Sequence, residues 1–342
     1  LAEEPENRHL QRQLHRIYLA EISTVHAFCS GILRTYAHLL DIPADFRVAE
    51  EAESKALQNK VLEELLEQAY AEIDSDEDFQ AMVDTFGYGR DDRRLPEAVI
   101  MAHKQMRCRA DMDGWMEKTL QALDLSQYDD VSQTPWGSYL LREHRIFLQR
   151  QEKKMAAAVE EMQQYPNIEK GFGKVFWENL AQLRALSDCH TWDDFYNRKV
   201  ATFGRVGTVR DPEDAAVKER LAKIRSLCWS ELKTRQEYFT APSEAVLADL
   251  ACTTVGTQAL LRFAKRFDEA YSREKRQRKL MDFSDLEHAA IKLLTDRYTG
   301  KPTAAAKELS GRFVEIMVDE YQDSNEIQDT IFEALSRSGR NR

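Results

Sequence analysis

The side chains best suited to chemistry lie in a run of five residues, Asp319-Glu320-Tyr321-Gln322-Asp323. They follow residues 313–318 (FVEIMV), a nearly continuous apolar run typical of a strand buried on both faces of a parallel sheet. Open α/β sheets bind ligands at the carboxyl ends of such strands. Two adjacent carboxylates there can hold Mg²⁺ on a nucleotide and accept a proton from an attacking water. An isolated Asp-Glu pair would more simply be a solvated acidic loop, but the pentapeptide is more specific.

A second candidate segment is residues 23–29, STVHAFC. Residues 19–25 (LAEISTV) predict a short strand that leads directly into a helix over residues 26–40. Small hydroxyls and free amides at a helix N-terminus are good phosphate donors, so Ser23 and Thr24 are candidates for contacting a phosphate. Plain helix capping is the alternative for Ser23 and Thr24.

Residues 281–286 (MDFSDL) form a third candidate segment. Asp282, followed three residues later by Asp285, predicts a capping box at a helix start, and Phe283 is a weaker candidate for touching a base. Upstream, residues 262–279 hold eight Lys/Arg against three Asp/Glu. A charge run is usually a solvated helix face, but here it also suggests contacts with phosphates, by Arg273, Lys275, Arg276 and Arg278.

Together and in this order, the three segments resemble those of UvrD-like superfamily 1 DNA helicases. VDEYQDSNEIQ resembles motif II of that family, STVHAFC a segment that lies along single-stranded DNA, and DFSDL the segment that precedes motif II. The resemblance implies that Asp319 binds Mg²⁺, that Glu320 is the general base, and that Gln322 links the γ-phosphate to the DNA-binding elements. It also implies that Ser23, Thr24 and His26 contact single-stranded DNA. Two positions depart from the family pattern, since Ser324 replaces the more usual Thr and Ala27 the more usual Ser.

The intervening sequence looks most like the AddA type of helicase–nuclease, with RecB-like and simple UvrD-like proteins as near alternatives. DIPADFRVAEEAES and FDEAYSREKRQRKLMDFSDLEHAAIKLL carry this likeness. It implies an ATP-dependent helicase that uses ATP and Mg²⁺ and acts on single-stranded and duplex DNA in double-strand-break repair and recombination. It further implies an exonuclease domain elsewhere, a cytoplasmic location and an AddB-like partner subunit.

The elements that must position these residues are mainly helices. Only 13 Gly and 8 Pro interrupt 342 residues, and apolar stripes predict helices over 51–73, 93–109, 136–164, 170–187, 213–239, 243–272 and 283–297. We therefore expect a mostly α fold: a remnant of a RecA-like α/β P-loop NTPase domain with parallel strands and a large helical insertion. The predicted boundaries are 1–28 and 312–342 for the RecA-like parts and 29–311 for the insertion.

Composition excludes several classes of protein. With 43% hydrophobic and 31% charged residues and no long apolar run, the chain is neither disordered nor membrane-spanning. The five cysteines form no zinc-ligand spacing, and a net charge of −11 confines any DNA contact to local basic patches. The phosphate-binding pattern GxxxxGK[ST] is absent, and Gly171-Phe172-Gly173-Lys174 resembles it only superficially, so we expect a fragment that lacks the P-loop.

Two further hypotheses stay open at this point. One is a helical module that binds DNA or docks a partner without catalysis of its own, which the basic run favours. The other is an all-α scaffold in which DEYQD is accidental, and this hypothesis predicts no strand at 313–318.

Overall fold

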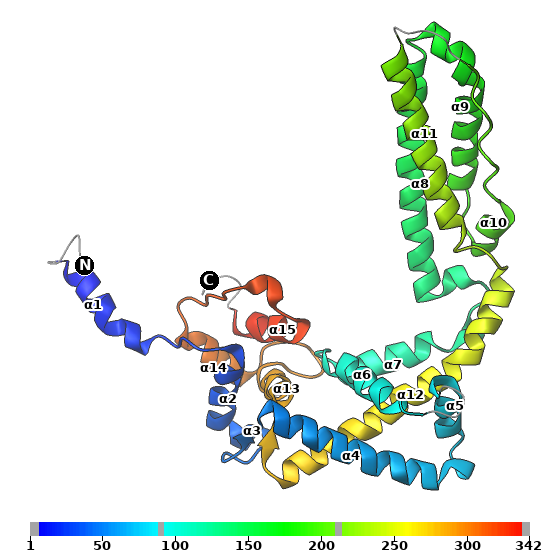
Figure 1. Ribbon diagram of the computed structural model, residues 1–342. Coiled ribbons are helices and arrows are strands. Elements are labelled where there is room, and N and C mark those ends of the chain that lie inside the picture. The colour runs from blue at the N-terminus through cyan, green and yellow to red at the C-terminus, as the bar shows by residue number, and fades with distance from the viewer. Residues whose placement is uncertain (1–6, 88–91, 209–213, 337–342) are drawn as a thin grey trace. The chain divides into compact units, whose positions relative to one another are not determined.

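The computed structural model describes residues 7–87, 92–208 and 214–336. The chain divides into two compact units (Figure 1), one formed by Leu1–Lys118 with Gly256–Arg342 and the other by Thr119–Val255. These divisions do not coincide with the predicted boundaries at 28/29 and 311/312. The predicted boundary at 28/29 falls inside the helix Val25–Thr35 and that at 311/312 inside the helix Ala304–Arg312, and both helices contribute to one hydrophobic core of the first unit.

The first unit is built from helices and one very small sheet. Its elements up to residue 118 are α1 (Arg8–Arg16), α2 (Val25–Thr35), α3 (Ala37–Leu40), β1 (Arg47–Val48), α4 (Glu51–Ala71), α5 (Glu77–Phe86), α6 (Leu95–Arg107) and the start of α7 (Met112–Ala122). Its later elements are the second part of α12 (Ser243–Gln277), β2 (Leu280–Met281), α13 (Phe283–Leu294), α14 (Ala304–Arg312) and α15 (Glu326–Leu335). Short 3-10 turns at Ile17–Leu19, Ile73–Ser75 and Tyr321–Asp323 connect them.

Two apolar clusters hold this unit together. In the first, α13 packs against α2 and α15 (Figure 1). Leu33, Ala290 and Ile331 are fully buried in this cluster. In the second, α4, α5, α6 and α12 surround Met82 and Phe267. Burial of large apolar side chains contributes about 1.5–3 kcal/mol each, which is why the helical stripes in the sequence predict these helices well.

The two strands predicted from sequence are not strands. The sheet within the described residues instead joins β1 to β2 in parallel, with Arg47 opposite Leu280 and Val48 opposite Met281. Residues 19–25 end a 3-10 turn, run on as exposed irregular chain and start α2 at Val25, while residues 313–318 are irregular. Apolar side chains alone do not form a strand, because its backbone groups need a neighbour with which to hydrogen-bond.

The two segments nevertheless lie close together. The Arg312 guanidinium pairs with Glu21 at 2.6 Å, and the rings of Phe28 and Phe313 have centroids 6.2 Å apart. Side chains, and not a shared sheet, therefore bring these two segments together.

The second unit is a group of long helices. It contains α8 (Pro135–Met162), α9 (Pro166–Ser187), α10 (Trp192–Asn197), α11 (Ala215–Gln236) and the first part of α12, with 3-10 turns at Leu125–Gln127 and Val131–Gln133. Its core contains Leu148, Phe176 and Leu183. Gly171-Phe172-Gly173-Lys174 lies inside α9, which agrees with the prediction that it is no phosphate loop.

His144 lies in the core of the second unit among aromatic rings. Its ring centroid is 4.8 Å from that of Phe195 and 5.0 Å from that of Phe239, and its Nδ1 has no hydrogen-bond partner among the described residues. Burial, reinforced by the nearby Arg235 guanidinium, lowers the pKa of His144 to about 4. The imidazole is therefore neutral at pH 7 and serves as packing.

Candidate functional site

The fold brings together two candidate DNA-contacting rings that are far apart in the sequence. His26, in the first turn of α2, stacks on Phe283, the first residue of α13, with ring centroids 4.4 Å apart and an angle of 22° between the planes. Phe283 is 51% exposed and the His26 side chain 34% exposed. The pair offers an aromatic face to solvent, and such a face is suited to stacking with a nucleic-acid base.

The residues before His26 lie at the N-terminus of α2. Thr24 is the N-cap, and its hydroxyl oxygen accepts a hydrogen bond from the amide of Ala27 at 3.3 Å. This is the capping role given as the alternative interpretation, and it leaves the first amides of α2 next to the aromatic pair. Ser23 is exposed, and Phe28 is packed against the core.

The N-terminus of α13 is held by its predicted capping box. The Asp282 carboxylate accepts from the amide of Asp285 at 2.9 Å, and the Asp285 carboxylate accepts from the amide of Asp282 at 3.1 Å. This arrangement confirms the structural interpretation of the DFSDL segment. Because Phe283 is the first residue after the cap, the cap also decides where its ring lies.

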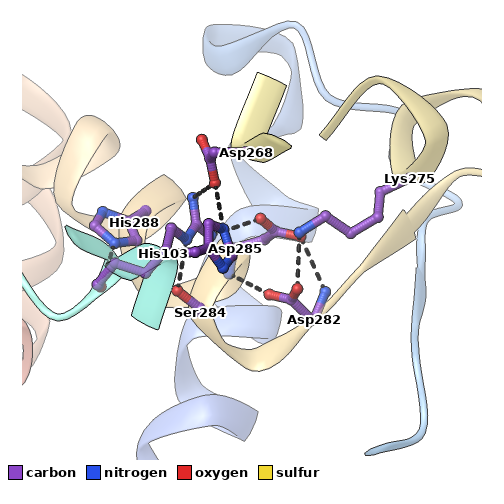
Figure 2. A network of polar contacts seen from close by, with 8 residues as sticks. His103, Asp268, Lys275, Asp282, Ser284, Asp285 and His288 are labelled. Carbon is purple, nitrogen blue, oxygen red and sulfur yellow. Dashed lines mark hydrogen bonds and ion pairs between the residues drawn. The ribbon is translucent and has the colours of Figure 1, made fainter. Parts of the chain in front are cut away.

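A buried ion-pair network holds the two carboxylates of the capping box in place (Figure 2). Lys275 Nζ lies 2.7 Å from Asp282 Oδ2 and 2.6 Å from Asp285 Oδ2, and Arg107 pairs with Asp285 at 2.7 Å. Burial alone would raise the pKa of Asp282, but the Lys275 ammonium lowers it below its ordinary value. Asp268 accepts from His103 at 2.9 Å and completes the network.

The four basic residues predicted to contact DNA fall into different environments. Lys275 is 3% exposed and ion-paired, which argues against a phosphate contact for it. Arg278 pairs with Glu274 at 3.1 Å in the exposed turn that follows α12. Arg273 and Arg276 are exposed and line a cavity of about 690 Å³, and neither forms an ion pair with a described residue. They are therefore the two of the four whose charges are best placed for a phosphate.

The acidic segment 319–323 is exposed and tightly turned. Glu320 has a left-handed backbone with φ of 50°, a strained conformation for a non-glycine residue that is often found at functional sites. Its amide donates to the Asp319 carboxylate at 3.0 Å, and the Gln322 amide nitrogen donates to the Glu320 carboxylate. The turn thus presents both carboxylates to solvent and orients one of them.

These donors are compatible with a magnesium ion. Mg²⁺ prefers oxygen ligands and is commonly held by one or two carboxylates, with water and phosphate oxygens completing the octahedron. The carboxylates of Asp319 and Glu320 can supply one or two oxygens of this kind. No group of three or more potential metal ligands gathers in the part of the chain that is described, so a site built from protein side chains alone is not present there.

Sequence reasoning missed the residues that support the aromatic pair. Glu287 lies 3.2 Å from His26 Nε2 and accepts from Gln328 at 2.8 Å, and Arg107 reaches the capping box from α6. Glu287 lies one helical turn after Phe283 and Gln328 falls within VDEYQDSNEIQ, so both positions could have been noticed. No sequence pattern pointed to Arg107, because it lies far from DFSDL in the sequence.

Comparison with known proteins defines the class of protein. The family model of the UvrD/REP helicase N-terminal domain matches residues 2–341, and the chain belongs to this family. The DEYQD pentapeptide lies inside the match, so it is not accidental. The all-α scaffold hypothesis was right only in predicting no strand at 313–318. Among the described helices, none is both long and apolar enough to span a bilayer.

Individual relatives narrow the likeness further. The chain is 30% identical over 351 residues to the A subunit of the ATP-dependent helicase/nuclease of Acetivibrio thermocellus, covering 98% of this chain and 28% of the relative. It is 32% identical over 354 residues to the protein of the same name from Pelotomaculum thermopropionicum, covering 99% and 27%, respectively. For that of Moorella thermoacetica the identity is 33% over 352 residues, covering 98% and 24%. The chain thus spans about a quarter of the length of these relatives.

Proposed function

We propose that this chain is part of the motor of an ATP-dependent DNA helicase that translocates on and unwinds DNA in double-strand-break repair and recombination. We place it in the AddA type, acting in the cytoplasm, with an exonuclease domain elsewhere in the longer protein. The observation that carries the proposal is the stacking of His26 on Phe283 at 4.4 Å, because it joins two segments of the family pattern into one exposed aromatic surface.

In this proposal the aromatic pair receives a base of single-stranded DNA. The first amides of α2, with Ser23 and Thr24, take the neighbouring phosphate, since a helix N-terminus favours negative charge. Arg273 and Arg276 provide further phosphate contacts at their cavity, with duplex or single-stranded DNA. Binding of this kind is insensitive to sequence, because it uses ring faces and phosphates and not base edges.

The nucleotide part of the proposal rests on the 319–323 turn. Asp319 would hold Mg²⁺, which when bound with ATP neutralises charge on the phosphates. Glu320 would take the proton from the attacking water, and Gln322 would link the γ-phosphate to the DNA-binding elements. The Gln322 amide nitrogen also donates to the Glu320 carboxylate. This division of roles predicts that, in the longer protein, Glu320→Gln lowers kcat by orders of magnitude with ATP binding nearly intact, whereas Asp319→Ala weakens Mg²⁺–ATP binding. Equal losses of binding and turnover in both variants would contradict it.

A partner protein follows from the way the relatives are named. Each is called the A subunit of an ATP-dependent helicase/nuclease, and a lettered subunit implies that those proteins work with at least one other. We extend this to the present chain and propose an AddB-like protein as its partner.

The stacking surface can be tested by binding of oligothymidylate to the chain. Phe283→Leu keeps an apolar side chain but removes the ring, so affinity should fall by about 5- to 150-fold, the equivalent of the 1–3 kcal/mol typical of one base stacked on an aromatic side chain. The matched control is Tyr298→Leu, because Tyr298 is 93% exposed in the same unit but lies in a loop outside the three segments. Equal affinity for both variants would place the DNA site elsewhere.

The runner-up function is a helical module that binds DNA or docks a partner without catalysis of its own. The guanidiniums of Arg273 and Arg276, which have no ion-pair partner among the described residues, favour it. It predicts that DNA binding survives every change to Asp319 and Glu320 and that these changes leave the activity of the longer protein unaltered.

A further inference from the structure

Glu287 is a buried carboxylate between the aromatic pair and the helix that follows the acidic turn. It lies on α13, one turn after Phe283, and is 6% exposed. One of its oxygens, Oε1, lies 3.2 Å from His26 Nε2 on α2 and accepts a hydrogen bond from Gln328 Nε2 on α15 at 2.8 Å. A buried carboxylate requires such partners, because burying it without them would cost several kcal/mol.

These contacts hold the His26 ring from two directions. The face of the ring rests on Phe283, and its Nε2 is held by the carboxylate one helical turn further along α13. Phe283 and Glu287 are four residues apart and therefore lie on the same face of α13. Their two contacts together hold the His26 ring against this face. A ring that is fixed before binding does not lose its rotational freedom when a base arrives.

We propose that Glu287 is a positioning residue that holds His26 in its stacked orientation for DNA and ties this orientation to α15 through Gln328. The inference rests on the proposed DNA-binding role of the aromatic pair. Gln328 follows Asp323 by five residues and lies in the first turn of α15, so its hydrogen bond to Glu287 gives the helix after the 319–323 turn a polar contact with the carboxylate that holds His26.

The direction in which one substitution changes DNA affinity distinguishes a positioning role from a purely electrostatic one. Glu287→Gln preserves the shape of the side chain and an oxygen for Gln328 but removes the charge that holds His26. If Glu287 acted only as a negative charge near DNA, its removal would tighten binding. Positioning predicts the opposite, an affinity for oligothymidylate about three- to tenfold weaker, because the ring must then be ordered on binding. The matched control is Glu333→Gln, an exposed carboxylate on α15 that undergoes the same change of charge.

Two further measurements distinguish positioning from a general loss of structure. The imidazole proton signals of His26, which Phe283 shifts by its ring current, should move toward solvent-exposed values in Glu287→Gln and partly so in Gln328→Ala. In a His26→Ala background, Glu287→Gln should have no additional effect on affinity, because the interaction it supports is gone. Thermal unfolding of each variant shows whether the fold is retained.

Unchanged His26 signals together with unchanged or tighter DNA binding in Glu287→Gln would overturn the inference. Failure of the proposed function looks different, since His26→Ala and Phe283→Leu would then leave DNA binding unaltered. In that case the His26 signals still decide whether Glu287 positions the ring.

Discussion

Replacing Lys275 with methionine removes the ammonium from the network behind the capping box while keeping most of the side chain's apolar stem. Asp282 and Asp285 then face each other in a buried site, and among the described residues Arg107 is the cation that remains paired with them. Removing one partner of a buried ion pair typically costs about 3–5 kcal/mol. The free energy of unfolding of a native protein is about 5–15 kcal/mol, so a large part of the stability of the first unit should be lost.

The matched control is Lys265→Met on the same helix. Lys265 pairs with Asp113 at 3.1 Å, but both side chains are about half exposed, at 46% and 57%. Solvent-exposed pairs of this kind contribute about 0–1 kcal/mol. The two variants thus lose the same charge from α12, and they differ mainly in burial.

Urea unfolding followed by circular dichroism measures both free energies of unfolding. The loss of unfolding free energy caused by Lys275→Met should become smaller as the pH falls, because Asp282 becomes protonated. Its folded-state pKa is below the ordinary 3.8, so its contribution is present above that pH and is lost as the pH falls further. A cost below about 1 kcal/mol at pH 7, equal to that of Lys265→Met, would refute the network as a source of stability.

Two other predictions concern the second unit and the cavity. In the second unit, His144→Phe should flatten the pH dependence of stability between pH 6.5 and about 4, because the lowered pKa of His144 means that stability is full above 6.5 and falls toward 4. The change is worth roughly 3 kcal/mol, and unfolding curves that keep the native pH dependence would contradict it. At the cavity, Arg273→Gln with Arg276→Gln should lower the slope of log affinity for single-stranded DNA against log salt by about 1.4, or about 0.7 for each lost phosphate contact. The control is the double variant Lys55→Gln with Lys60→Gln, which replaces two exposed lysines. Equal salt slopes for the two double variants would show that Arg273 and Arg276 do not contact phosphates.

The sequence by itself determined the helices and the family. Apolar stripes placed α4, α8 and α12 within a few residues of their ends, because burial of one helical face is a local pattern with a period of 3.6 residues. The capping box at Asp282 was equally local and was confirmed. The three ordered segments identified the family, which the match over residues 2–341 confirms.

Only the tertiary structure decided which of the predicted residues share a surface. His26 and Phe283 meet because α2 and α13 pack together, and no local rule predicts a ring contact across such a separation. Lys275 belongs to a basic run in the sequence, yet its position on α12 turns it inward to two carboxylates. Charge patterns alone do not distinguish a solvated cation from a buried one.

For the two predicted strands, the local sequence pattern was misleading. Residues 19–25 and 313–318 have the apolar character of strands, but a strand exists only when its amides and carbonyls pair with a neighbour. β1 and β2, with two residues each and no strong pattern, form a sheet because their backbone groups pair: the Arg47 amide donates to the Lys279 carbonyl and the Ala49 amide to the Met281 carbonyl. Side-chain pattern is a property of the sequence, whereas hydrogen-bonded pairing is a property of the fold.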